Sequence, residues 1–252
     1  MLQNKLKIND SKTEFMLLGS KSTLKKLQHL NLKITVGDEE IPPSSKVRNL
    51  GPLFDSEMSM KDQVSSVTRT SYFHLRRIKK ISHHLDQHSC AKLINACVTS
   101  RLDCQNALLT GCPNKTLQRL QVVQNNAARM LTGTRQRQHI TPVLKDLHWL
   151  PVTSRVQFKV LVFIHQALHN DNSPSYIKDT ISIYHPKRNL RSSSDNLMLV
   201  IPMCHRSWGS SSFNVLGARL WNELPYNIRR IQSKAAFKNH LKTHLFRNVF
   251  EL

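Results

Sequence analysis

Short apolar runs separated by polar turns characterise the first part of the chain. Apolar residues cluster at 15–18, at 32–36 and within 46–54. The polar stretches 9–11 and 37–40 precede or separate these runs, as turn residues do. We therefore expect short β-hairpins here. Because an isolated hairpin is marginal in water, we also expect further strands to pair with them.

From Met60 onward the pattern changes to the three- and four-residue spacing of amphipathic helices. The first stripe consists of Met60, Val64, Val67, Ser71, Leu75, Ile78 and Ser82. Further helices are expected at 88–102, at 116–131 before a C-cap at Gly133, at about 154–170 and at about 233–250. The residues expected on one side are Cys90, Ile94, Cys97 and Arg101 in the first of these helices and Leu117, Leu120, Val123, Ala127 and Leu131 in the second. The third is expected to have an apolar face of Val156, Val160, Phe163, Ile164, Ala167 and Leu168. A short strand is expected at 197–201. The predicted fold class is α+β, predominantly α, with hairpins at the N-terminus, a helical bundle, and a mostly helical C-terminal part with a small β element.

The face of the first long helix opposite its apolar stripe combines cations with aromatic rings. It is expected to present Arg69, Tyr72, Phe73, Arg76, Arg77 and Lys80, flanked by Lys79. At 100° per residue, Arg69, Arg76 and Lys80 fall within about 40° of one another. Cations follow a phosphate backbone and exposed rings stack on bases, which suits a single strand or a heteroduplex. A solvated basic face without a ligand is the alternative interpretation.

The charge of the whole chain favours binding to a polyanion. Lys and Arg outnumber Asp and Glu by 37 to 16, which gives a formal charge of +21. Residues 61–140 carry 13 of these cations and only 3 carboxylates, and a second basic row lies at Lys234, Lys238 and Lys242. Nucleic acid is therefore the expected partner. An anionic membrane would attract the same charge, but the longest apolar run, 160–164, is far too short to span a bilayer.

Neither the cysteines nor the histidines predict a metal site. The candidates are Cys90, Cys97 and Cys104, and two pairs, His165 with His169 and His240 with His244. A seven-residue spacing on a helix separates two thiolates by about 10 Å, whereas zinc sites place two on one turn. The histidine pairs have no third ligand and no glutamate of an HExxH motif. We expect no metal and no cofactor, buried cysteines, and surface or partly buried histidines.

Six stretches succeed one another across nearly the whole chain. They are KINDSKTEFMLLGS, VRNLGPLFDSEMSM, RLDCQNALLTGCP, RLQVVQNNAARMLTGTRQRQHITPVLKDLHWLPVTSRVQFK, RNLRSSSD and ARLWNELPYNIRR followed by FKNHLKTHLF. This succession resembles the carboxy-terminal part of a reverse transcriptase from a non-LTR (LINE-type, Jockey-like) retrotransposon. The resemblance implies a palm-edge and primer-grip remnant at 1–56, a thumb-like helical bundle at 57–138 and a C-terminal domain at 139–252. It makes Asn49, Leu50 and Gly51 a primer-grip-like turn and places the missing strands upstream, in a palm that this chain lacks.

The family is an RNA-directed DNA polymerase, but the carboxylates for its reaction are missing. Two-metal polymerisation needs carboxylates that hold two Mg²⁺ ions, and the family supplies them from an aromatic-Ala-Asp-Asp hairpin. No Asp-Asp pair occurs in this chain. The chain also departs from the family pattern at Cys104-Gln105 and at Pro52, which removes a ladder donor from the primer-grip hairpin. We expect no catalytic residue and no enzyme activity of the chain alone, but at most binding of RNA or an RNA–DNA hybrid, largely without sequence specificity.

Three hypotheses stay open. The chain is one piece of a longer active reverse transcriptase, a module that folds alone and binds nucleic acid, or a translated transposon relic without a selected role. A coding stretch for aromatic-Ala-Asp-Asp just upstream of Met1 would favour the first. With neither a signal peptide nor a transmembrane segment in the sequence, an intracellular location, nuclear or cytoplasmic, is expected.

Overall fold

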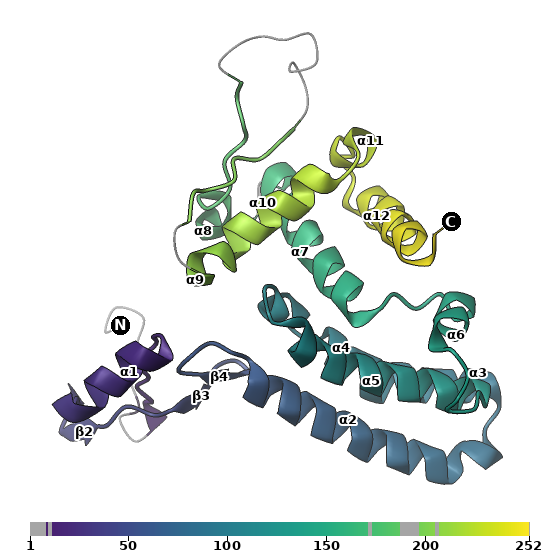
Figure 1. The fold of residues 1–252 in the computed structure, drawn as a ribbon, viewed down its shortest axis with the longest axis horizontal. Coiled ribbons are helices and arrows are strands. Elements are labelled where there is room, and N and C mark those ends of the chain that lie inside the picture. The colour runs from purple at the N-terminus through teal and green to yellow at the C-terminus, as the bar shows by residue number, and fades with distance from the viewer. Residues whose placement is uncertain (1–8, 10–11, 171–172, 187–196, 205–206, 252) are drawn as a thin grey trace. The chain divides into compact units, whose positions relative to one another are not determined.

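The computed structural model describes residues 9, 12–170, 173–186, 197–204 and 207–251. Figure 1 shows a mostly helical chain with two small β-hairpins near the N-terminus, which confirms the α+β, predominantly α class. The chain divides into two compact units, Met1–Val67 and Thr68–Leu252, and the boundary falls within one long helix. The three-part division expected from the sequence stays a prediction.

The first unit contains two antiparallel hairpins, each a separate two-stranded sheet. Its elements are α1 (Lys21–Leu27), η3 (Gln28–Leu30), β1 (Ile34–Val36), β2 (Glu39–Ile41), β3 (Lys46–Arg48) and β4 (Leu53–Asp55). In the first hairpin Ile34 pairs with Ile41, and in the second Val47 pairs with Phe54. The apolar pattern had predicted a strand at 32–36 followed by a turn at 37–40, but Glu39 and Glu40 belong to β2. The run 46–54 contains β3, a turn and most of β4, and this second hairpin was implied by the resemblance rather than by the pattern.

The strand expected at 15–18 does not form. Phe15 makes a single parallel bridge to Pro43, in which its carbonyl accepts from the Ser44 amide at 2.6 Å. Prolines 42 and 43 have no N–H to donate, so the bridge cannot extend into a ladder. Residues 10–11 of the expected first turn lie outside the described part of the chain.

The carboxylate of Asp55 fixes the start of the long helix α2 (Lys61–Ile81). It accepts hydrogen bonds from the backbone amides of Ser59 at 2.9 Å and Met60 at 2.8 Å, and from the Ser59 hydroxyl at 3.2 Å. A carboxylate at this end satisfies donors that have no partner within the helix and complements its dipole. The last residue of β4 therefore determines where α2 begins.

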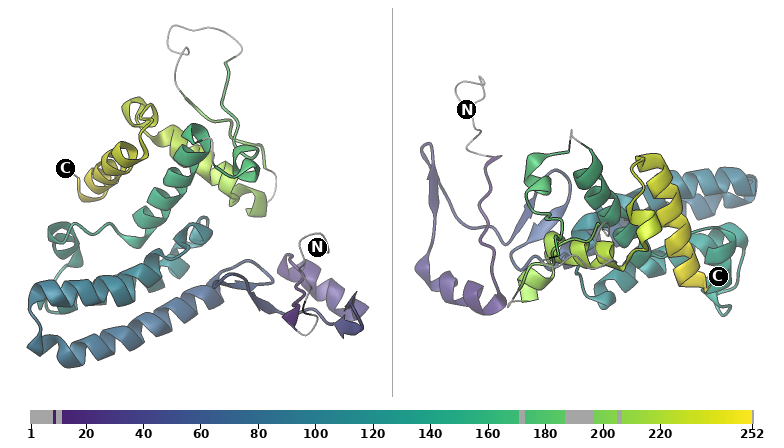
Figure 2. Two further views of the ribbon diagram at one scale, coloured as in Figure 1. Left: turned by 180° about the vertical axis from the view of Figure 1, so that it is seen from behind. Right: turned by 90° about the horizontal axis from the view of Figure 1, so that it is seen from above.

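The second unit is helical, and α7 is its central element. Its elements after α2 are η4 (Ser82–His84), α3 (Gln87–Ile94), η5 (Asn95–Thr99), α4 (Ser100–Asp103), η6 (Asn106–Leu109), α5 (Asn114–Thr132), α6 (Ile140–Asp146), α7 (Val152–His169), α8 (Ser175–Lys178), α9 (Ser207–Ser210), α10 (Phe213–Glu223), α11 (Tyr226–Arg229) and α12 (Lys234–Phe250). Helices α5, α10 and α12 all contact α7 (Figures 1 and 2). The main apolar core forms around α7, with Trp221 of α10 and Phe237 of α12 fully buried against it.

Two expected faces differ from the observed ones. In the helix expected at 88–102, the buried positions are Cys90, Ile94, Val98 and Leu102, which recur every four residues. They lie on one side because η5 is a turn of π-helix, which has more residues per turn than an α-helix. Cys97 is half-buried as a result. On α7, Phe163 was expected in the apolar face but is 39% exposed.

The strand expected at 197–201 is a single antiparallel bridge between Leu199 and Ile183. Both backbone groups of Leu199 bond to the side chain of Asn222 on α10, with the amide at 2.8 Å and the carbonyl at 2.9 Å. The Asn222 amide thus takes the position of a second neighbouring strand. The stretch 187–195, part of the resemblance, lies outside the described residues.

Two glutamines of α5 hold the chain at the start of α7. Gln124 is 2% exposed and donates to the Leu150 carbonyl at 2.9 Å, while Gln121 accepts from the Val152 amide at 2.8 Å. The two side chains are also bonded to each other, from Gln121 Nε2 to Gln124 Oε1 at 3.0 Å. Buried amides with satisfied partners fix geometry, so residues 150–152 have one defined path along α5.

His165 lies in the core of the second unit, which corrects the expectation of a surface or partly buried histidine. Its side chain is 1% exposed, and its ring stacks on Phe237 with 4.1 Å between centroids. Its Nε2 lies 2.7 Å from the Ile231 carbonyl, which can only accept, so Nε2 carries the hydrogen of a neutral imidazole. Burial lowers the pKa of His165, and the charges of His169 and Lys234 act in the same direction, against the opposing hydrogen bond to Ile231.

We expect the chain to lose stability as the pH falls below about 6.5, the ordinary pKa of histidine. Because the pKa of His165 is lowered in the folded state, the unfolded chain binds its proton first, so stability is complete above that pH and declines below it. Each such histidine costs at most about 1.4 kcal/mol per pH unit. Urea midpoints at pH 7.5 and 5.5 would measure the decline. His165→Leu should reduce it, and a midpoint that rises at pH 5.5 would contradict the assignment.

Candidate nucleic-acid interface

The exposed face of α2 presents four of the predicted cations together. Arg69, Arg76, Arg77 and Lys80 are exposed, and Phe73 among them is 48% exposed. Within the described part of the chain, none of the four forms an ion pair with a carboxylate. Their charge is therefore available to a ligand, and the buried stripe on the other side of α2 keeps this face toward solvent.

Phe73 and Arg77 contact each other on this exposed face. The Arg77 guanidinium carbon lies 5.5 Å from the centre of the Phe73 ring, within the range of a cation–π contact. A planar cation beside an exposed ring can stack on a base while it neutralises a phosphate. The sequence had predicted both residues on this face.

Tyr72 does not share the exposed face, which corrects the expectation for this ring. It is half-buried, and its hydroxyl accepts a hydrogen bond from Asn126 Nδ2 on α5 at 2.8 Å. At 100° per residue, Tyr72 lies about 60° from Arg69 toward the buried stripe, so its ring reaches the neighbouring helix. Its role is to hold α2 against α5, and a stacking role remains only for Phe73.

Arg101 of α4 extends the basic surface and was not among the predicted residues. It is exposed, and its charge, together with that of Arg77, lowers the pKa of the half-buried His74, for which burial is the largest cause. His74 is therefore neutral at pH 7, and the positive potential here comes from arginines. A helical wheel of α2 alone could not find Arg101, because only the packing of α4 brings it to this place.

The primer-grip-like residues Asn49, Leu50 and Gly51 lie in the turn of the second hairpin. Leu50 and Gly51 both have positive φ, of 51° and 113°, as a two-residue hairpin turn requires. The Asn49 amide donates to the Pro52 carbonyl at 3.0 Å. Pro52 removes only the reciprocal bond, so the hairpin forms despite it. Leu50 is 91% exposed, and the role of the turn in gripping a primer stays a prediction.

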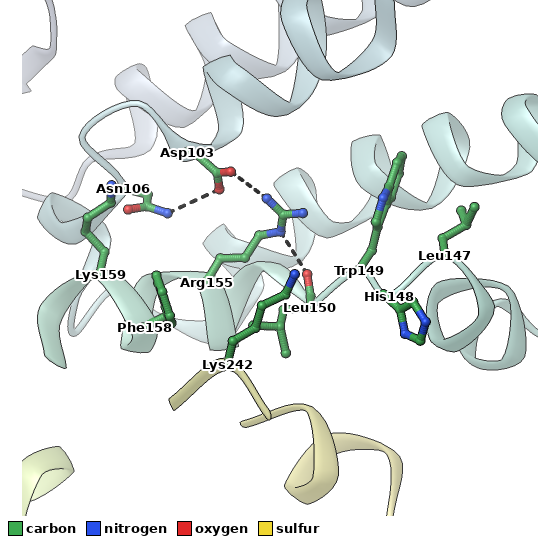
Figure 3. A pocket seen from close by; sticks show the side chains of 10 residues that line it. All are labelled: Asp103, Asn106, Leu147, His148, Trp149, Leu150, Arg155, Phe158, Lys159 and Lys242. Carbon is green, nitrogen blue, oxygen red and sulfur yellow. Dashed lines mark hydrogen bonds and ion pairs between the residues drawn. The ribbon is translucent and has the colours of Figure 1, made fainter. Parts of the chain in front are cut away.

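A pocket of about 410 Å³ opens in the second unit, between α4, α7 and α12. Figure 3 shows its ten lining residues, which are Asp103, Asn106, Leu147, His148, Trp149, Leu150, Arg155, Phe158, Lys159 and Lys242. Arg155 donates to the Asp103 carboxylate and, from Nε, to the Leu150 carbonyl at 2.9 Å. No sequence pattern indicated this pocket, because its residues come from separate segments that meet only in the folded chain.

The described residues include no group of three or more His, Cys, Asp or Glu side chains that could hold a metal ion. Of the cysteines expected to be buried, Cys90 is buried, and burial raises the pKa of its thiol, whereas Cys104 is exposed. No helix in the described ranges is long and apolar enough to cross a bilayer.

Comparisons of the chain with protein-family models, with curated proteins and with solved structures found no match.

Proposed function

We propose that this chain is the carboxy-terminal part of a non-LTR retrotransposon reverse transcriptase and that it binds RNA or an RNA–DNA hybrid, largely without sequence specificity. The observation that carries the binding proposal is the face of α2. There, four exposed cations have no carboxylate partner among the described residues, and one exposed ring lies between them. Fixed cations in a row are what a phosphate backbone requires.

Nucleic acid fits this face better than a membrane surface does. A helix that lies in a membrane interface inserts its apolar side among the lipids. Leu75 and Ile78, in the buried stripe of α2, are each 5% exposed and already packed in the protein, whereas Ile81 in the last turn is 46% exposed. The face with the four cations therefore offers a ligand charges and the Phe73 ring, and these are the groups that bind phosphates and bases.

Polymerisation by the chain alone is not part of the proposal. The sequence contains no Asp-Asp pair, and the resemblance assigns a metal to none of its carboxylates. What the chain retains of the proposed parent enzyme is the capacity to hold its template or product.

The test combines a binding and an activity measurement on the purified chain. Affinity for a short single strand and for an RNA–DNA hybrid should fall linearly with salt on a log–log plot and differ little between sequences. No primer should be extended with dNTPs and Mg²⁺ or Mn²⁺. Salt-independent affinity, or no binding at low salt, would contradict the binding proposal. Metal-dependent extension above a boiled control would contradict the absence of activity.

A further inference from the structure

The pocket between α4, α7 and α12 contains a carboxylate held in one orientation. Asp103 accepts from Arg155 through Oδ2 and faces Asn106 Nδ2 at 3.5 Å through Oδ1. Figure 3 shows Arg155 and Asn106 on opposite sides of it. A carboxylate has about four lone-pair sites, and the Asp103 side chain is 37% exposed, so it can accept a further hydrogen bond from a ligand.

Asn106 supports Asp103 in a way that the fold alone does not explain. It is 2% exposed, and its Oδ1 has no hydrogen-bond partner among the described residues. A buried acceptor without a partner is unfavourable, and such groups in folded proteins call for a reason. Here the amide nitrogen faces Asp103, so the side chain positions the carboxylate at a cost in stability, as functional sites do.

Three cations and an indole ring line the pocket together with this carboxylate. Arg155, Lys159 and Lys242 line the pocket together with the half-buried Trp149. Lys242 reaches in from α12 (Figure 3) and ends a row of exposed lysines that includes Lys234 and Lys238. Successive lysines of this row are about 6 Å apart along the helix axis. The row therefore offers positive charge along a path that ends at the pocket.

We propose that this pocket takes one unpaired nucleotide of the bound strand. Lys242 binds its phosphate, the Trp149 ring packs on the base, and Asp103 accepts a hydrogen bond from an amino group on the edge of the base. The volume lies within the range of small-molecule sites. Cytosine, whose N4 is a donor, is preferred to uracil, which presents an oxygen to the carboxylate. This inference rests on the proposed function and adds a preference at one nucleotide to a binding that is otherwise largely without sequence specificity.

The test uses CMP, UMP and inorganic phosphate as probes in equilibrium dialysis against the full chain. CMP should bind at one site, and UMP should bind about tenfold more weakly because it lacks the donor. Lys242→Gln should weaken CMP binding about tenfold, the value of one charge-assisted hydrogen bond. Lys238→Gln makes the same charge change one turn away, outside the pocket, and should leave CMP binding within about twofold.

The Asn106→Leu variant distinguishes a role of Asn106 in ligand binding from a purely structural role. It removes the unpaired acceptor, so the chain should keep or gain stability in urea while CMP binding weakens. Three results would each contradict the nucleotide site: the same loss of CMP affinity in Lys238→Gln as in Lys242→Gln, equal affinity for CMP and phosphate, or an unchanged affinity for CMP in Asn106→Leu. If CMP does not bind but a single strand still binds with salt dependence, the pocket inference fails and the proposed function stands. If the strand does not bind either, the proposed function fails.

Discussion

Replacing Arg69, Arg76 and Lys80 together with glutamine is expected to lower the affinity for a single strand about 100-fold at 0.1 M salt. Each phosphate neutralised on a single strand contributes about −0.7 to the slope of log affinity against log salt. Removing three cations that have no carboxylate partner among the described residues should make the slope shallower by about two. Fluorescence anisotropy with a labelled strand over a salt series measures both quantities.

Matched variants show whether the position of the charges matters. Lys21, Lys25 and Lys26 on α1 are also exposed, and their replacement by glutamine removes the same net charge from another place. That control should change the slope much less. Phe73→Ala should weaken binding by about 1–3 kcal/mol with little change in slope, since stacking does not depend on counterions. Tyr72→Phe removes only the bond to Asn126 and should affect stability rather than affinity.

An unchanged slope in the triple variant would show that the α2 face is only solvated. The binding surface would then have to be sought on α12, where Lys234, Lys238 and Lys242 are exposed as well. Equal losses in the α1 control would show that net charge alone attracts the strand.

Trp221→Ala is expected to destabilise the second unit by about 3–5 kcal/mol, the range for a large aromatic removed from a core. The side chain is fully buried beside Phe237, with 5.8 Å between ring centroids. Its Nε1 donates to the Leu197 carbonyl at 2.7 Å, so truncation also leaves that carbonyl without this donor. Unfolding in urea followed by circular dichroism measures the loss.

Two substitutions serve as references for this effect. Trp221→Phe keeps most of the apolar contact and removes the donor, so it should cost about 1–3 kcal/mol. Phe163→Ala removes an aromatic ring from α7, the helix that α10 contacts, but that ring is 39% exposed, so the cost should be well below that of Trp221→Ala. A loss in Trp221→Ala no larger than in Phe163→Ala would contradict the central position of α10 against α7.

The helices were predictable where their apolar spacing follows 3.6 residues per turn. Five residues of the stripe, Met60, Val64, Ser71, Leu75 and Ile78, are buried as expected, while Val67 and Ser82 are half-buried. Leu117, Leu120, Val123 and Ala127 of α5 are buried as expected, and α5 ends at Gly133 with φ of 68°. The region 88–102 was predicted as a helix but with the wrong face, since Cys90, Ile94, Val98 and Leu102 recur every four residues. That spacing drifts about 40° per step on an α-helix, and a π-turn corrects it.

The polar contacts between helices could not be predicted, because they depend on which helices meet. Tyr72 lies at the edge of its stripe, and only the position of Asn126 on α5 decides that its hydroxyl is bonded. The pocket joins Asp103, Arg155 and Lys242 from three helices, and no local pattern links them. The α2 cations were predictable because they belong to a single helix and need no partner.

The contact of Gln121 and Gln124 with residues 150–152 constrains the number of residues between α6 and α7 more than their identity. Both glutamines bond to main-chain atoms, a carbonyl at Leu150 and an amide at Val152, which almost any residue would provide. Substitutions at these two positions keep the bonds as long as the apolar packing is kept. An insertion or deletion between α6 and α7 shifts the carbonyl and the amide out of register with the two glutamines. Among related chains, this connection should therefore vary in sequence while it keeps its number of residues.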